Sequence, residues 1–109
     1  MRGAMPSANP VAIFAALGDP TRAELVHRLG AGDPQSIARL GRDIAISRQA
    51  LTKHLRNLEG AGLATQERVG RETLYRIDPA GLLVAQRWIG EISAQWDDVI
   101  DRLKRHVEG

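Results

Sequence analysis

Hydrophobic residues recur every three or four positions through most of the chain, and this is the spacing of one face of an α-helix. Four helices are expected in the first half, over about residues 10–17, 20–29, 36–43 and 47–59. Asn-Pro and Asp-Pro pairs open the first two, because an Asn or Asp side chain accepts from free N–H groups and proline suits the first helical position. In the fourth, Leu51, Leu55 and Leu58 form one apolar stripe, which predicts a buried face.

A single stretch of the chain has the pattern of β-strands. The segments 65–69 and 73–77 flank a tight turn at Gly70-Arg71-Glu72, which predicts a β-hairpin. No other segment carries a strand signal, so the expected fold is mainly α-helical with one small hairpin.

The last segment has apolar residues in an unbroken alternation of three- and four-residue steps, as in a coiled coil. These seam positions are Leu82, Ala85, Ile89, Ile92, Trp96, Val99 and Leu103. They predict one long helix over about residues 79–107, with a gentle irregularity near Gly90, that pairs with a second copy of the chain. The first helix has apolar residues that also need a partner, namely Val11, Phe14 and Leu17. We therefore expect a homodimer whose interface is formed by the first and last helices.

The order of these elements is that of a winged helix-turn-helix. Two short helices joined by a turn precede a two-stranded hairpin, and the second of the two would be the recognition helix that enters the DNA major groove. We expect one such domain over residues 10–109, preceded by a flexible amino-terminal segment at 1–9.

Composition excludes several classes of protein. The chain of 109 residues is 43% hydrophobic and 26% charged, as in soluble globular domains. It has no cysteine, so disulfides, thiolate metal sites and cysteine nucleophiles are excluded. It has no catalytic motif and no phosphate-binding loop, so neither an enzyme nor a cofactor is expected. It has no apolar run long enough for a membrane and no signal pattern, so a cytoplasmic location is expected.

Charge is concentrated in the middle of the chain. Residues 36–76 carry eight basic and four acidic side chains, a local net charge of +4, which favours binding to double-stranded DNA. The candidate DNA-binding residues are Ser47, Arg48, Gln49, Thr52, Lys53, His54, Arg56 and Arg71. Gln49 suits adenine and Lys53 suits guanine, whereas Arg48, Thr52 and Arg56 suit phosphates. An arginine at the hairpin tip can enter a minor groove or pair with a phosphate. On the hairpin, Arg71 at the tip is the main candidate, with Arg68 and Arg76 beside it on the strands.

His54 differs from the other candidates in its position on the recognition helix. It lies about 60° around the helix from the Leu51 stripe rather than at the centre of the polar face. We therefore expect it to form a hydrogen bond within the helix-turn-helix or to approach a phosphate, and not to read a base.

Four segments together resemble the ArsR family of winged-helix repressors. They are FAALGDPTRAELVHRL at 14–29, ISRQALTKHLRNL at 46–58, EGAGL at 59–63 and VGRETLY at 69–75. The resemblance covers about residues 11–105 and is specific in the order of its motifs. It implies a homodimeric repressor that binds an inverted-repeat operator and is released by an effector.

The chain departs from the family at its sensor sites. Many members bind metals through a Cys-x-Cys motif, which is absent here. A second family site uses Asp, His and Glu on the last helix, where this chain has Asp97, Asp98, Asp101, His106 and Glu108 but lacks the Asp-x-His start. No metal site is therefore expected, although a metal-responsive repressor stays an alternative, as does a module that binds protein or RNA. A small-molecule effector is compatible with the sequence, which does not identify one.

Overall fold

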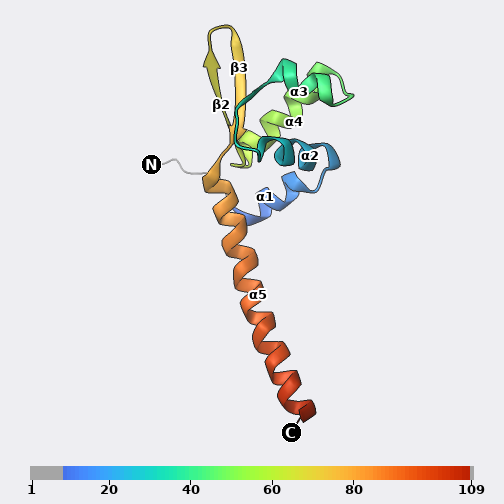
Figure 1. Ribbon diagram of the computed structural model, residues 1–109, viewed down its shortest axis with the longest axis vertical. Helices are drawn as coiled ribbons and strands as arrows, with labels where there is room; N and C mark the ends of the chain where they lie inside the picture. The colour runs from blue at the N-terminus through green and yellow to red at the C-terminus, as the bar shows by residue number, and fades with distance from the viewer. Residues whose placement is uncertain (1–8, 109) are drawn as a thin grey trace.

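The computed structural model describes residues 9–108, so all of the expected flexible segment except Asn9 lies outside the described residues. The elements follow in the order α1 (Pro10–Leu17), α2 (Pro20–Leu29), β1 (Gln35–Ser36), α3 (Ile37–Asp43), α4 (Arg48–Gly60), β2 (Ala64–Val69), β3 (Glu72–Ile77) and α5 (Pro79–Glu108). Figure 1 shows a compact body formed by α1 to α4 and the sheet, from which α5 projects as a long rod. The expected winged helix-turn-helix with its helical majority is confirmed.

The helices begin where the sequence predicts, because each of the first four has a polar residue before its first turn. Asn9 and Asp19 accept from backbone N–H groups three residues ahead, at 2.9 and 3.0 Å. Ser36 and Ser47 do the same for α3 and α4, both at 3.1 Å. These caps satisfy N–H groups that have no partner inside the helix.

The core of the body is built on leucine. The predicted stripe of α4, Leu51, Leu55 and Leu58, is completely buried, as are Leu25 and Leu29 of α2. The other large side chains of this cluster are Ile13 of α1, Leu40 of α3, Leu63 just before β2, and Tyr75 of β3. Because α4 buries one whole face against three other helices and the sheet, its opposite face is held rigidly toward solvent.

The sheet has three strands, not the two that the sequence predicts. β2 and β3 form the expected hairpin, and β1 adds a third strand beside β3 in the order β1-β3-β2. β1 consists of only two residues, Gln35 and Ser36, which pair with Tyr75 and Leu74 through backbone groups. Two residues are too few for an alternating pattern, so this strand has no sequence signal.

The long helix α5 docks on the body through its first three turns. Gly81 lies so close to the turn after α4 that an added Cβ would be 2.0 Å from the carbonyl oxygen of Gly62. The ring of Phe14 in α1 packs against the ring of Trp88, with a centroid distance of 5.2 Å. The helix is continuous through Gly90, and at 1.5 Å per residue it is about 45 Å long. Within residues 9–108, no helix is both long and apolar enough to cross a membrane.

Candidate nucleic-acid interface

The solvent face of α4 gathers five of the eight predicted DNA-binding residues. Arg48, Gln49, Thr52, Lys53 and Arg56 line one open hollow on the surface of the helix. All of them except the half-buried Thr52 are exposed. Gln49, Lys53 and Arg56 lie on the side of the helix away from the leucine stripe, and Arg48 and the half-buried Thr52 lie at the edge of the same surface.

The chemistry of this face matches what DNA offers in its major groove. An amide such as Gln49 makes paired hydrogen bonds with adenine, and the ammonium of Lys53 donates to the acceptors of guanine. Arg48 and Arg56 flank these two residues with positive charge suited to phosphates. Ser47 has a different place, since its hydroxyl oxygen accepts from the N–H of Ala50 and caps the helix.

The tip of the hairpin approaches the amino-terminal end of α4. Arg71 follows Gly70, whose positive φ of 63° makes the tight turn that glycine adopts readily. Arg71 and Arg48 line a common hollow together with Glu72 and Thr73 of β3 and the start of α3. The structure therefore brings the predicted wing arginine and the first residue of the recognition helix to one surface.

The remaining wing arginines have unequal surroundings. Arg76 donates to Glu67 across the hairpin at 2.9 Å, whereas Arg68 is exposed and forms no side-chain bond to another described residue. On the same face as Arg68, the amide of Gln66 donates to the Glu59 carboxylate of α4 at 3.1 Å. This bond ties the wing to the recognition helix, and the sequence pattern did not indicate it.

His54 lies apart from the polar hollow. Its side chain is 23% exposed, and its Nδ1 atom is 3.2 Å from an Nη atom of Arg22 and 3.9 Å from a carboxylate oxygen of Asp19. His54 thus forms a hydrogen bond, as expected, but its partner lies in α2, outside the two helices α3 and α4 of the helix-turn-helix. The same Asp19 carboxylate caps α2 by accepting a hydrogen bond from the backbone N–H of Arg22. This bond holds the pKa of Asp19 below its usual range.

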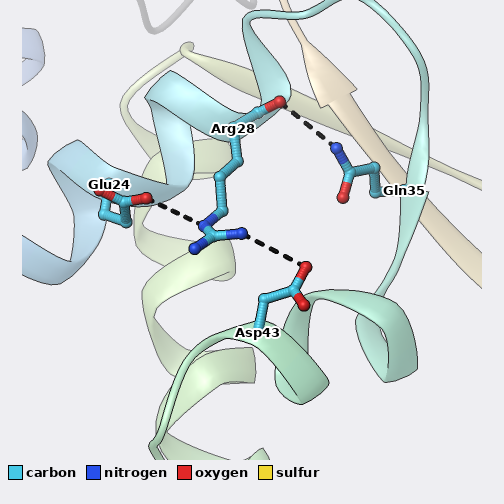
Figure 2. A network of polar contacts seen from close by, with 4 residues as sticks. All are labelled: Glu24, Arg28, Gln35 and Asp43. Atoms are coloured by element: carbon cyan, nitrogen blue, oxygen red, sulfur yellow. Dashed lines mark hydrogen bonds and ion pairs between the residues drawn. The ribbon is translucent and has the colours of Figure 1, made fainter.

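A second arginine of α2 connects that helix to the first helix of the motif. As Figure 2 shows, Arg28 lies between Glu24 of its own helix and Asp43 at the end of α3, with N–O distances of 3.0 and 3.3 Å. The Arg28 carbonyl oxygen also accepts from the Gln35 amide of β1 at 3.3 Å. Both ion pairs are partly exposed, so each contributes little to the free energy of unfolding. The pair with Asp43 joins α2 to the end of α3.

Known transcriptional regulators match most of the chain. The HTH-type transcriptional regulator Rv2034 of Mycobacterium tuberculosis is 38% identical over 74 residues, which are 68% of each chain. YuzN of Bacillus subtilis, an uncharacterized HTH-type transcriptional regulator, is 40% identical over 63% of this chain and 78% of its own. A helix-turn-helix domain family matches residues 17–67. The structure of an ArsR-like transcriptional regulator from Rhodococcus sp. RHA1 is 39% identical, covers 87% of this chain and 89% of its own, and superposes with a TM-score of 0.75.

The chain belongs to the ArsR family of winged helix-turn-helix transcriptional regulators. It is accordingly a DNA-binding transcriptional regulator, and the resemblance derived from its sequence motifs is confirmed. The β2–β3 hairpin is the wing of this fold, and α4 is the helix for which the sequence predicts the recognition role.

This ArsR-family protein has a second exposed surface, on α1 and α5, where the sequence predicts a dimer interface. Among the seam residues, Leu82, Ile89, Trp96 and Leu103 are exposed, and Ile92 and Val99 are half-buried. Val11 of α1 is 78% exposed. Phe14 and Leu17 are half-buried against the core. Ala85 differs from the prediction, because it is buried in the core of its own chain at the point where α5 docks on the body.

The acidic and histidine residues near the end of α5 do not form a cluster within one chain. In residues 9–108, no three His, Asp or Glu side chains come close enough together to hold a metal ion. Asp97, Asp98, Asp101, His106 and Glu108 are all exposed along the projecting part of the helix.

Proposed function

We propose that this ArsR-family regulator is a homodimeric repressor that binds an inverted-repeat operator. The observation that carries the proposal is the hollow on α4, where an amide and four hydrogen-bonding or cationic side chains lie on one exposed face beside the wing. In this arrangement Gln49 and Lys53 read base edges, and Arg48, Arg56 and Arg71 bind phosphates.

The unpaired apolar surface of α1 and α5 supports the dimer. Both helices lie on the same side of the body (Figure 1). Exposed seam residues follow one another along most of α5. An apolar helix face of this length is typical of an interface between chains. A two-fold dimer places two recognition helices about 34 Å apart, one turn of the duplex, and so matches an inverted repeat.

Repression requires only that the dimer occupy its operator. The side chains of the α4 hollow and of the wing bind DNA through hydrogen bonds and charge, and this binding makes or breaks no covalent bond. The protein therefore acts by competing with other proteins for the same stretch of DNA.

The test uses a duplex that the wild-type protein selects from a randomised DNA pool, with an unrelated duplex for comparison. The single variants Gln49→Ala and Lys53→Ala each weaken binding to the selected duplex by about 1–3 kcal/mol and relax the preference at one base pair. Arg56→Ala weakens binding to both duplexes and lowers the salt dependence by about one counterion.

The control variant is Gln86→Ala/Arg87→Ala, which removes one amide and one cation from exposed positions of α5. It retains the affinity of the wild-type protein, because neither side chain lies on the DNA face. If the double variant Gln49→Ala/Lys53→Ala binds the selected duplex as tightly as this control, α4 is not the reading element.

A further inference from the structure

Arg22 of α2 touches two helices that have different tasks. Its Nε atom donates to the carbonyl oxygen of Ala16 near the end of α1, at 2.8 Å. Its Nη1 atom is 3.2 Å from Nδ1 of His54 in the middle of α4. One side chain thus connects a helix of the proposed dimer face to the recognition helix.

The bond to α1 uses a backbone group that has no partner in its own helix. The last carbonyls of a helix lack an N–H four residues ahead, and Ala16 is the next-to-last residue of α1. A guanidinium also suits this position because the carboxyl end of a helix carries partial negative charge. Arg22 is therefore held at a fixed place relative to α1.

The bond to α4 requires one form of the histidine. A guanidinium only donates hydrogen bonds, so Nδ1 of His54 has to accept, and the ring hydrogen lies on Nε2. The side chain of His54 is on the flank of α4, between the buried leucine stripe and the exposed polar hollow. Because His54 lies on this flank, its bond to Arg22 bears on the rotation of α4 about its own axis, and so on where Gln49 and Lys53 lie relative to the DNA.

We infer that Arg22 is a positioning residue for the recognition helix, acting through His54. It sets the angle between α4 and the dimer face, and so the spacing and pitch at which two recognition helices meet an inverted repeat. The inference rests on the proposed homodimer, because the spacing between two recognition helices exists only when two chains bind the two half-sites together.

Arg28 provides the internal comparison. It lies on the same helix and carries the same group, but among the described residues its side chain bonds to Glu24 and Asp43, which lie in α2 and α3. A variant at Arg28 loses a similar number of polar contacts without changing the link between the dimer face and the recognition helix.

The experiment measures the affinity of full-length Arg22→Met and Arg28→Met for the selected duplex and for the unrelated duplex. Arg22→Met loses about tenfold in affinity for the selected duplex, which is about 1.4 kcal/mol, and less than twofold for the unrelated one. It remains a dimer and keeps the salt dependence of the wild-type protein, because no phosphate contact is lost. Arg28→Met changes both affinities by less than twofold.

Variants of His54 test whether the effect passes through this residue. His54→Leu removes the acceptor and lowers affinity for the selected duplex about as much as Arg22→Met does. His54→Asn places an oxygen close to the position of Nδ1 and restores most of the loss. The double variant Arg22→Met/His54→Leu loses no more than either single variant, because both break the same bond.

Two results would overturn the inference. One is that Arg22→Met prefers the selected duplex as strongly as the wild-type protein does. The other is a double variant whose losses multiply to about a hundredfold, which would mean that Arg22 and His54 act independently. A wild-type protein that shows no preference between the two duplexes would instead refute the proposed function, so the two failures are distinguishable.

Discussion

The helices α4 and α5 have the same apolar period but opposite surroundings. In α4 the three leucines of the stripe are completely buried by the chain itself. In α5 the buried residues are Gly81 and Ala85, both in the first two turns, and every described apolar side chain after them is exposed or half-buried. A periodic pattern indicates that a face will be covered, but it does not say whether the same chain or another one covers it.

This difference separates two kinds of stability. The body has a closed core of its own, so changes there alter the free energy of unfolding of each chain. The exposed part of α5 contributes only when a second chain covers it, and burial of each large apolar side chain then contributes roughly 1.5–3 kcal/mol. Variants in the two helices should therefore have different primary effects.

The largest effect is expected from Trp96→Glu on α5. Trp96 is 58% exposed in the single chain, so the substitution leaves the body intact and puts a charge into the proposed interface. We expect a folded monomer that loses the contribution of the second half-site, with affinity for the selected duplex reduced by about 10³-fold toward non-specific binding. Sedimentation equilibrium and DNA titration measure the two effects.

Ala94→Glu is the matched control for this substitution. Ala94 is also exposed, but it lies at the outermost heptad position, opposite the seam. The same added charge there leaves the dimer intact. A dimeric Trp96→Glu variant, or a monomeric wild-type protein at micromolar concentration, would rule out the proposed interface.

The next largest effect is expected from Leu55→Ala in α4. Leu55 is completely buried, so the truncation leaves a cavity and lowers the free energy of unfolding by about 2–5 kcal/mol. Chemical denaturation at one fixed protein concentration measures this cost, because unfolding of a dimer depends on concentration. Leu103→Ala on the exposed part of α5 should behave differently, with a cost that falls as the protein is diluted. Equal, concentration-independent costs at the two positions would contradict the distinction between the helices.

Short-range features of this fold could be predicted from the sequence, whereas contacts across it could not. The caps at Asn9, Asp19 and Ser47, the buried stripe of α4 and the hairpin turn all depend on residues within a few positions of each other. β1 was missed because its two residues pair through backbone groups with a strand almost forty residues later. Ala85 was assigned to the dimer seam because periodicity does not indicate where a helix begins to leave its own body.

The candidate site divides in the same way. Helical geometry was enough to place His54 away from the centre of the polar face, but it did not indicate which helix His54 bonds to. Its partner Arg22 is 32 residues away, and the Gln66–Glu59 link joins a strand to a helix. Such pairs are set by tertiary packing, and no spacing rule in a single sequence reveals them.

The smallest effect concerns pH. It comes from the ionisation of one phenol, that of Tyr75, which lies in the core of the body. Tyr75 is the only tyrosine of the chain and is 2% exposed in the core at the base of the wing. Burial raises the pKa of its phenol above the usual value of 10.0, and the nearby Glu59 carboxylate raises it further. In the unfolded chain the phenol ionises at its ordinary pKa, so the stability due to the neutral buried phenol is present below about pH 10 and is lost as pH rises through the folded pKa.

We therefore expect the free energy of unfolding of the wild-type protein to fall more steeply above pH 10 than that of Tyr75→Phe, by less than the cost of Leu55→Ala. The tyrosinate absorbance of the wild-type protein reports the same event directly, because no other phenol contributes to it. Trp96→Glu, which changes only α5, should leave this absorbance titration unshifted if the body folds without a partner chain. A phenol that ionises at its ordinary pKa in that variant would show instead that closure of the body depends on the dimer, and would remove the distinction between the two helices.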